Sequence, residues 1–146
     1  MGFTNDLLTG LAQHLTTLDL GLTYNPGGVY TAAQTGIVIG PMPASPDKVV
    51  ALQPYPVRSG ARSDVTQGVQ VRIRGAARTP INAVNDLADD IYDALHGATD
   101  VDLGPIRVSL IIRASHALMG PDANARQETS SNYYLETAHP SAHVTD

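Results

Sequence analysis

Two stretches of the chain carry apolar residues at the spacing of one helix face. In residues 4–19, leucines recur at steps of three and four, at positions 7, 8, 11, 15 and 18. A second stripe starts just after Thr79-Pro80, a pair typical of a helix start, and stops at Gly97. Its members are Ile81, Val84, Ala88, Ile91 and Leu95. The pattern predicts two amphipathic helices.

Alternating apolar and polar residues predict the strands. The clearest case is residues 69–73, where β-branched residues alternate with polar ones. Residues 35–39 and 48–52 are short, apolar and β-branched, and they flank a proline-rich segment, so we expect a hairpin-like pair. Residues 106–112 alternate in the same way, and residues 127–137 are rich in strand-forming types. We expect these last two segments to pair across a turn at residues 119–125.

The order of these elements predicts an α+β fold. Glycine and proline interrupt the chain within residues 21–34, and polar residues do so within residues 57–66, so we expect loops there. The resulting order is α-β-β-β-α-β-β, with two α-helices packed on one face of a mainly antiparallel β-sheet. We expect residues 1–138 to form a single domain and residues 139–146 to form a flexible tail.

The composition narrows the class of partner. Hydrophobic residues make up 42% of the 146 residues and charged residues only 16%, so much of the surface must consist of uncharged polar residues, glycine and proline. The net charge is −5, and the sequence shows no cluster of basic residues of the kind that binds the outside of a nucleic acid. The sequence has no cysteine and no apolar run long enough to cross a membrane. We expect a protein of the cytoplasm without disulfides.

The common catalytic motifs are missing from the sequence. It contains no G-x-x-x-x-G-K-[ST] loop, no G-x-S-x-G and no H-E-x-x-H. His139 and His143 lie beside Pro140 without a third metal ligand nearby. Asp89 and Asp90 are adjacent, so on a helix their side chains diverge by about 100° and cannot act as an acid and base pair. We expect no catalytic residue, no metal and no cofactor, and so no enzyme.

Two charged groups remain as candidate contact surfaces between subunits. Arg72 and Arg74 lie on one face of the strand at residues 69–73, where they suit pairing with acids of a neighbouring subunit as well as phosphate binding. The second helix carries aspartates on its outer face, which is typical of a solvated helix face. These are Asp86, Asp89, Asp90 and Asp93. The two arginines and the four aspartates are the candidate interface residues.

Three segments, in this order and spacing, resemble the tail terminator family of long-tailed bacteriophages, whose members are often labelled minor capsid proteins. The first combines GIVIGP at residues 36–41 with SPDKVVALQPY at residues 45–55. The second is GVQVRIRG at residues 68–75, and the third is VNDLADDIYDALHG at residues 84–97. With the leading helix and the closing strand pair, the likeness covers residues 4–137.

This resemblance implies a structural protein of the virion that acts by binding alone. Proteins that the sequence is similar to form a hexameric ring, which caps the tail tube, stops further tube subunits from adding and docks to the connector of the head. The implied partners are identical subunits, the tail tube protein and the head-tail connector or stopper protein. DNA passes through such a ring without specific binding, which a negative chain suits. We expect the loops at residues 21–34 and 57–66 to contact the tube or the connector.

Three other interpretations stay open. A head completion or stopper protein has a similar size and composition but binds the portal side. A tail tube protein shares the general design of sheet and helices, but it should polymerise into long tubes by itself. From a different class, a small enzyme or ligand-binding domain would use Tyr24, Tyr30, Tyr133 or His116 in a pocket.

Overall fold

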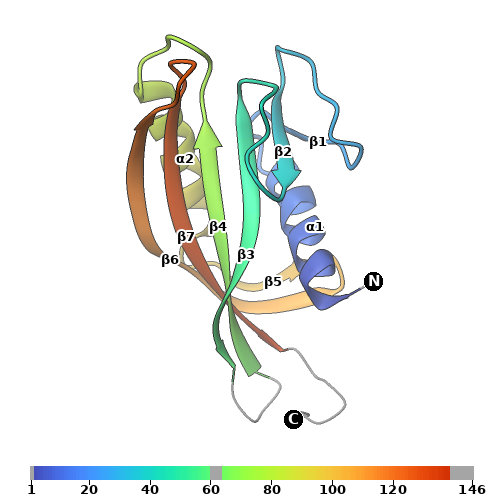
Figure 1. The fold of residues 1–146 in the computed structure, drawn as a ribbon. Coiled ribbons are helices and arrows are strands. Elements are labelled where there is room, and N and C mark those ends of the chain that lie inside the picture. Colours follow the sequence, from blue (N-terminus) through green and yellow to red (C-terminus); the bar gives the residue numbers. More distant parts are fainter. Residues whose placement is uncertain (1, 60–63, 139–146) are drawn as a thin grey trace.

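The computed structural model describes residues 2–59 and 64–138 of the chain. Two helices and the strands of one sheet follow each other along these residues. Their bounds are α1 Phe3–Thr16, β1 Leu22–Tyr24, β2 Thr35–Ile39, β3 Val49–Ser59, β4 Asp64–Arg74, α2 Asn82–Leu95, β5 Thr99–Leu103, β6 Ile106–Pro121 and β7 Gln127–Ala138. The seven strands lie side by side in the order β1-β2-β3-β4-β7-β6-β5 (Figure 1).

Both helices that the apolar stripes predict are present. In α2, the stripe residues Val84, Ala88, Ile91 and Leu95 are at most 2% exposed, because they face the sheet. The helix begins at Asn82, after the predicted start. The hydroxyl of Thr79 does not cap it but donates to the carbonyl oxygen of Ala76 at 2.7 Å, which closes a turn just before the helix.

The first helix, α1, crosses β5 at very short range. Gly10 is the point of closest approach, and a β-carbon there would lie 2.6 Å from the amide nitrogen of Gly104 and closer still to the carbonyl of Leu103. The helix backbone can lie against the strand backbone only because Gly10 has no side chain.

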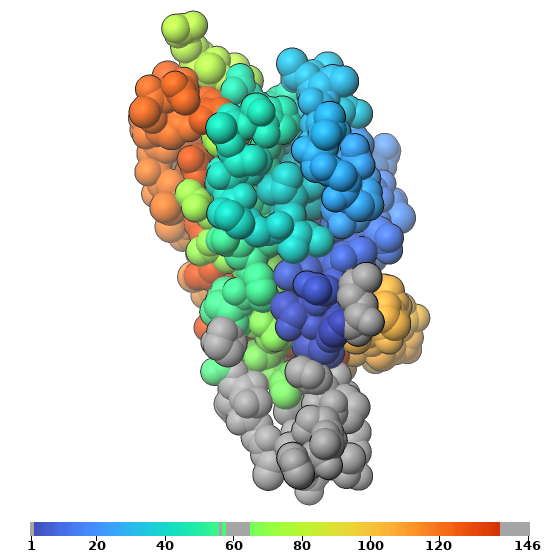
Figure 2. All heavy atoms as spheres, turned by 45° about the vertical axis from the view of Figure 1, so that its right-hand side comes forward, coloured from blue at the N-terminus to red at the C-terminus, as the bar shows by residue number. Residues whose placement is uncertain are grey.

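The pairing of β2 with β3 differs from the prediction. The strands are neighbours, but they run parallel, with Gly36 opposite Val49, so they do not form a hairpin. The connection at residues 40–48 is long enough to return the chain along the sheet before β3 begins. Figure 2 shows this connection beside the one at residues 25–34 on the surface. β1 also pairs with β2 in parallel, whereas β3, β4, β7, β6 and β5 pair antiparallel, so the prediction of a mainly antiparallel sheet is confirmed.

The strands are also more numerous and longer than the sequence pattern indicates. β1 and β5 are additional, and they lie at the two outer edges of the sheet. β3 continues to Ser59 and β4 begins at Asp64, so much of the loop expected at residues 57–66 is strand. The ladder passes Pro56 through a β-bulge, which is where an antiparallel pair tolerates proline. Residues 60–63 and the tail expected at residues 139–146 lie outside the described residues.

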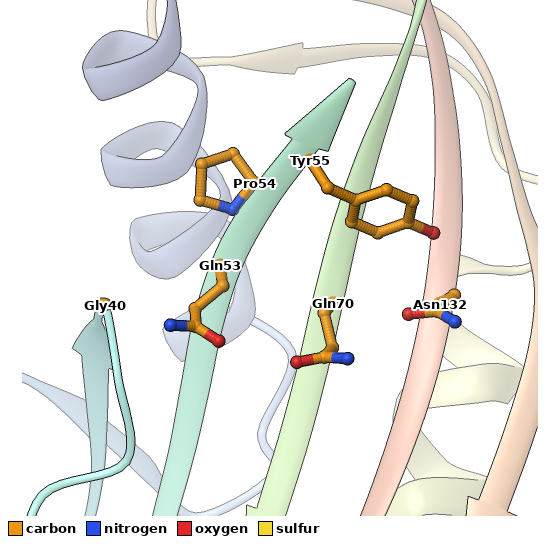
Figure 3. A pocket seen from close by; sticks show the side chains of 6 residues that line it. All are labelled: Gly40, Gln53, Pro54, Tyr55, Gln70 and Asn132. Carbon is orange, nitrogen blue, oxygen red and sulfur yellow. The ribbon is translucent and has the colours of Figure 1, made fainter. Parts of the chain in front are cut away.

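The two helices cover one face of the sheet, as predicted. Leu11 of α1 and Ile91 of α2 belong to the same buried cluster as Val50 of β3 and Val71 of β4. The opposite face, called the open face below, carries no helix among the described residues. Figure 3 looks onto the open face, with both helices behind the strands.

Candidate functional site

The open face has a row of uncharged polar side chains across its centre. Gln53 of β3 lies opposite Gln70 of β4, which in turn lies opposite Asn132 of β7. The side-chain amide of Asn132 donates to the hydroxyl of Ser115 at 2.9 Å, which extends the row to β6. Together with Gly40, Pro54 and Tyr55, the three amide side chains line a hollow of about 440 Å³ (Figure 3). Amide and hydroxyl groups therefore dominate the middle of this face.

Arg72, a candidate interface residue, lies on the open face and is already paired. Its Nη2 donates to Oε1 of Glu128 at 2.6 Å, and the two side chains are 28% and 11% exposed. Such a charge-assisted bond is short and strong, and it leaves the pair neutral as a whole. Arg72 therefore forms its ion pair within its own subunit.

Two arginines hold the connection at residues 40–48 against the open face. Arg74 is 3% exposed, and it donates to the carbonyl oxygen of Asp47 at 2.9 Å and to that of Pro46 at 2.6 Å. Arg126, which follows the turn between β6 and β7, pairs with the carboxylate of Asp47 at 3.2 Å. Because Arg74 is buried in this contact, its side chain is not free to bind a neighbouring subunit.

The four aspartates of α2 lie where the sequence places them, on the exposed side of the helix. Asp86, Asp89, Asp90 and Asp93 are all exposed. None of them forms an ion pair within residues 2–59 and 64–138. No group of three or more potential metal ligands occurs in that part of the chain. The structure thus brings the aspartates together as a surface, on the side of the sheet opposite to Arg72.

A second hollow lies on the helix side of the sheet, beside α2. It measures about 460 Å³, and Asp86 and Asp90 line it together with Lys48 and Thr35. The amino group of Lys48 donates to the carbonyl oxygen of Ala33 at 3.1 Å, so this cation is also held by its own chain.

The residues considered for an enzyme pocket do not converge. The hydroxyl of Tyr30 donates to the carbonyl oxygen of Ile37 at 2.5 Å and supports the connection before β2. Tyr133 is 1% exposed in the core, and Nδ1 of His116 lies 2.7 Å from the hydroxyl of Ser131. Each of these side chains has a local structural role.

Where α2 meets β6, cationic and aromatic side chains stack. The guanidinium of Arg113 lies 4.2 Å from the ring centre of Tyr92, whose ring stacks on that of His96 at 4.6 Å. Nδ1 of His96 accepts a hydrogen bond from the backbone amide of Arg113 at 2.9 Å. The pKa of His116 is lowered mainly by burial and secondly by the positive charge of Arg113. This junction fixes the end of α2 on the sheet.

The buried hydroxyl of Tyr133 makes the stability of the protein sensitive to alkaline pH. Burial raises the pKa of Tyr133 to about 12, although the nearby Arg113 acts against it. The unfolded chain loses this proton near pH 10, so the stabilisation is complete below that pH and is lost as the pH rises towards 12. Between pH 8 and pH 11, the free energy of unfolding should therefore fall in both proteins. For Tyr133→Phe, we expect this fall to be about 1 kcal/mol smaller than in the wild type.

Urea unfolding of both proteins at pH 8 and pH 11 measures this difference, and the pH 8 data serve as the internal control for the loss of the hydroxyl itself. Equal losses of stability in the two proteins between these pH values would contradict the assignment.

Several of these residues were not singled out by the sequence analysis. The alternation at residues 69–73 could have identified Gln70, because it places this residue on the same strand face as the candidate interface residue Arg72. Glu128 and Arg126 have no comparable signal, since their partners lie 56 and 79 residues away along the chain.

Comparison with known proteins adds one finding. A family model described as "Bacteriophage tail terminator protein" matches residues 15–138, which span β1 to β7 and all of α2. None of the curated proteins matches the chain. In residues 2–59 and 64–138, neither helix is long and apolar enough to cross a membrane.

Proposed function

Because the chain belongs to the bacteriophage tail terminator family, we propose that it forms the ring that ends the growth of the phage tail tube. The family makes the chain a structural component of the phage tail. In this proposal the ring is hexameric, assembles in the host cytoplasm and lies at the head-proximal end of the tail. It stops further tube subunits from adding, joins the tail to the connector or stopper protein of the head, and leaves a channel for DNA.

The open face supports a position beside the DNA channel, and this observation carries the proposal. Its central row is made of amide and hydroxyl side chains, and Arg72 is neutralised by Glu128. Arg74 and Arg126 are buried, at 3% and 6% exposure. Phosphate binding comes mainly from free lysine and arginine side chains. Within the described part of the face, the arginines are paired or buried, and a wall of this kind lets DNA pass without retaining it.

The acidic surface of α2 is suited to contact a partner on the other side of the subunit. We propose that Asp86, Asp89, Asp90 and Asp93 face a basic surface of a neighbouring subunit or of the connector protein. Charged groups of this kind set orientation and the rate of association more than affinity. Arg72 remains a candidate contact only where an acid of a partner competes with Glu128.

The test is to delete the gene for this chain in a phage that encodes it and to measure tails by electron microscopy. We expect tails of uncontrolled length that fail to join heads, because nothing then stops tube polymerisation. Complementation with the wild-type gene should restore a narrow length distribution. Normal-length tails beside heads that leak DNA would overturn the proposal and assign the chain to a stopper. A lack of any tube would assign it to the tube protein.

A further inference from the structure

The outer edge of β6 is covered as far as Arg113 and open beyond it. β5 pairs with β6 up to Leu110, and Nδ1 of His96 accepts the backbone amide of Arg113 at 2.9 Å. Along residues 114–119, no described strand lies on the side away from β7, and every residue of this stretch is exposed (Figure 1). An edge strand without lysine, proline or a cover is a template for pairing with another strand.

The register of the sheet shows which neighbour each residue of β7 bonds to. The amide of Gly75, just after β4, donates to the carbonyl oxygen of Gln127 at 3.0 Å. In an antiparallel sheet, successive residues of a strand bond to the neighbours on its two sides in turn. The ladder between β4 and β7 runs without a register shift. Odd-numbered residues of β7 therefore bond to β4, and even-numbered ones bond to β6.

The same alternation identifies the unpaired backbone groups of β6. Ser130 of β7 lies opposite Ala117 of β6, so these two residues bond to each other. The residues on either side of Ala117, which are His116 and Leu118, therefore direct their N–H and C=O groups away from β7, towards the open edge. Register shifts on both sides of residues 115–118 keep the regular part of this edge short. These groups match the spacing of a short extended chain.

The side chains beside these groups determine what a paired strand must carry. His116 and Leu118 lie opposite Ser131 and Thr129, which are buried on the helix side at 2% and 0% exposure. Leu118 itself is 63% exposed, so aliphatic residues on the helix side of an added strand would remove its surface from water. Ala117 points to the open face, where a small uncharged residue fits beside it.

The helix α2 makes the helix side of this edge acidic. Its residue Tyr92 stacks on Arg113 just before the open edge, so α2 lies beside β6. Burial and the charge of Arg113 lower the pKa of His116, whereas Asp89 acts in the opposite direction, which places Asp89 near the edge. Neither Asp89 nor Asp93 forms an ion pair in the described part of the chain. A basic residue on this side of an added strand would therefore be attracted.

The described edges of the chain itself do not supply such a strand. β5 carries Asp100 and Asp102, which the aspartates of α2 would repel. The edge of β3 beyond its pairing with β2 contains Pro54 and Pro56, which lack an amide donor. β1 and the end of β2 beyond Ile37, which β1 leaves uncovered, contain no basic residue. The occupant that fits is a segment of a different protein.

We propose that residues 115–118 of β6 bind an extended segment of another protein as an additional antiparallel strand of the sheet. On the side facing α2, this segment carries aliphatic residues and a lysine or arginine. On the open-face side it carries small uncharged residues. The added strand runs in the direction of β7, which continues the antiparallel order of this half of the sheet. This strand addition goes beyond the ring function and does not depend on it.

A designed peptide, acetyl-Thr-Lys-Thr-Val-Thr-Val-Thr-amide, tests the contact when it is labelled and titrated into the purified full chain by fluorescence anisotropy. In an antiparallel pair, the residues opposite His116 and Leu118 share both their hydrogen bonds and their side of the sheet. N-methylation of the lysine and the valines should therefore weaken binding by about tenfold or more. N-methylation of the threonines, whose amides point away from β6, is the matched control and should leave binding unchanged.

Variants of the protein and of the peptide test the side chains of the contact. Leu118→Lys should weaken binding by about tenfold, because it removes apolar surface and repels the lysine of the peptide. Val29→Lys is the matched control, since Val29 is 76% exposed and lies outside this edge, and it should bind the peptide as the wild type does. Glutamate in place of the peptide's lysine should weaken binding to the wild type.

Three results would overturn the proposal. The first is no binding of the unmethylated peptide at concentrations up to about 1 mM. The second is an equal effect of the two N-methylated sets, or a loss with the threonine set alone. The third is a dimer of the chain that the peptide dissociates, which would indicate pairing between two β6 edges. All of these readouts use purified protein, so they are separate from the tail lengths that test the ring function.

Discussion

Arg74→Ala should destabilise the protein by about 3 kcal/mol, because hydrogen bonds to a charged group contribute about 1.5–3 kcal/mol each and leave buried acceptors behind when they are lost. Arg74 binds the carbonyl oxygens of Pro46 and Asp47 at 2.6 and 2.9 Å while nearly fully buried. At roughly 4 °C per kcal/mol for a domain of this size, the midpoint of thermal unfolding should fall by more than 10 °C.

Arg107→Ala is the matched control for this prediction. Arg107 also forms an ion pair, with Asp102 at 2.9 Å, but both side chains are more than half exposed, at 62% and 66%. Solvent screens an ion pair between exposed side chains, so we expect almost no change in thermal unfolding. Arg74→Lys should recover only part of the loss, since an ammonium group cannot reproduce the fork of a guanidinium. Equal midpoints for Arg74→Ala and Arg107→Ala would show that Arg74 does not hold the connection.

Gly10→Ala should destabilise the protein by about 2 kcal/mol, although the same change in an open helix stabilises by about 0.5–1 kcal/mol. The added methyl group would lie 2.6 Å from the amide nitrogen of Gly104, and backbone atoms on both sides cannot move aside cheaply. The whole of α1 must shift away from β5. Urea unfolding measures the effect as a lower midpoint with an unchanged slope.

Gly2→Ala is the control for Gly10→Ala, at the start of the same helix. A β-carbon at Gly2 meets nothing within 4 Å, so we expect a stability within about 0.5 kcal/mol of the wild type. A Gly10→Ala protein as stable as Gly2→Ala would mean that α1 and β5 are not in close contact.

The sequence predicts the elements whose own periodicity is strong. The leucines of α1, the stripe of α2 and the alternation at residues 69–73 each repeat often enough to define one buried face. β1 is only three residues long, and the acidic sequence Thr-Asp-Val-Asp-Leu of β5 has a single fully buried side chain, so neither shows a usable pattern. Their pairing partners, and not their composition, make them strands.

The direction of β2 was not predictable for a related reason. Parallel and antiparallel strands share the same side-chain period of two, so apolar residues at 35–39 and 48–52 fit both arrangements. What decides between them is the path of residues 40–48, which Arg74 and Arg126 hold from distant parts of the chain. The same contact buries Arg74, although its position on β4 suggested an exposed arginine free to bind a partner.

The contact between Arg126 and the connection at residues 40–48 joins positions 82 residues apart, at Ala44 and Arg126. Contacts between positions so far apart raise the contact order of a chain, and a high contact order is typical of slow folding. During synthesis the connection stays without this support until residue 126 has left the ribosome, because domains complete their packing only when the required segments are present. In an unfinished chain the connection at residues 40–48 therefore lacks the side chain that binds both Ala44 and Asp47 in the finished protein.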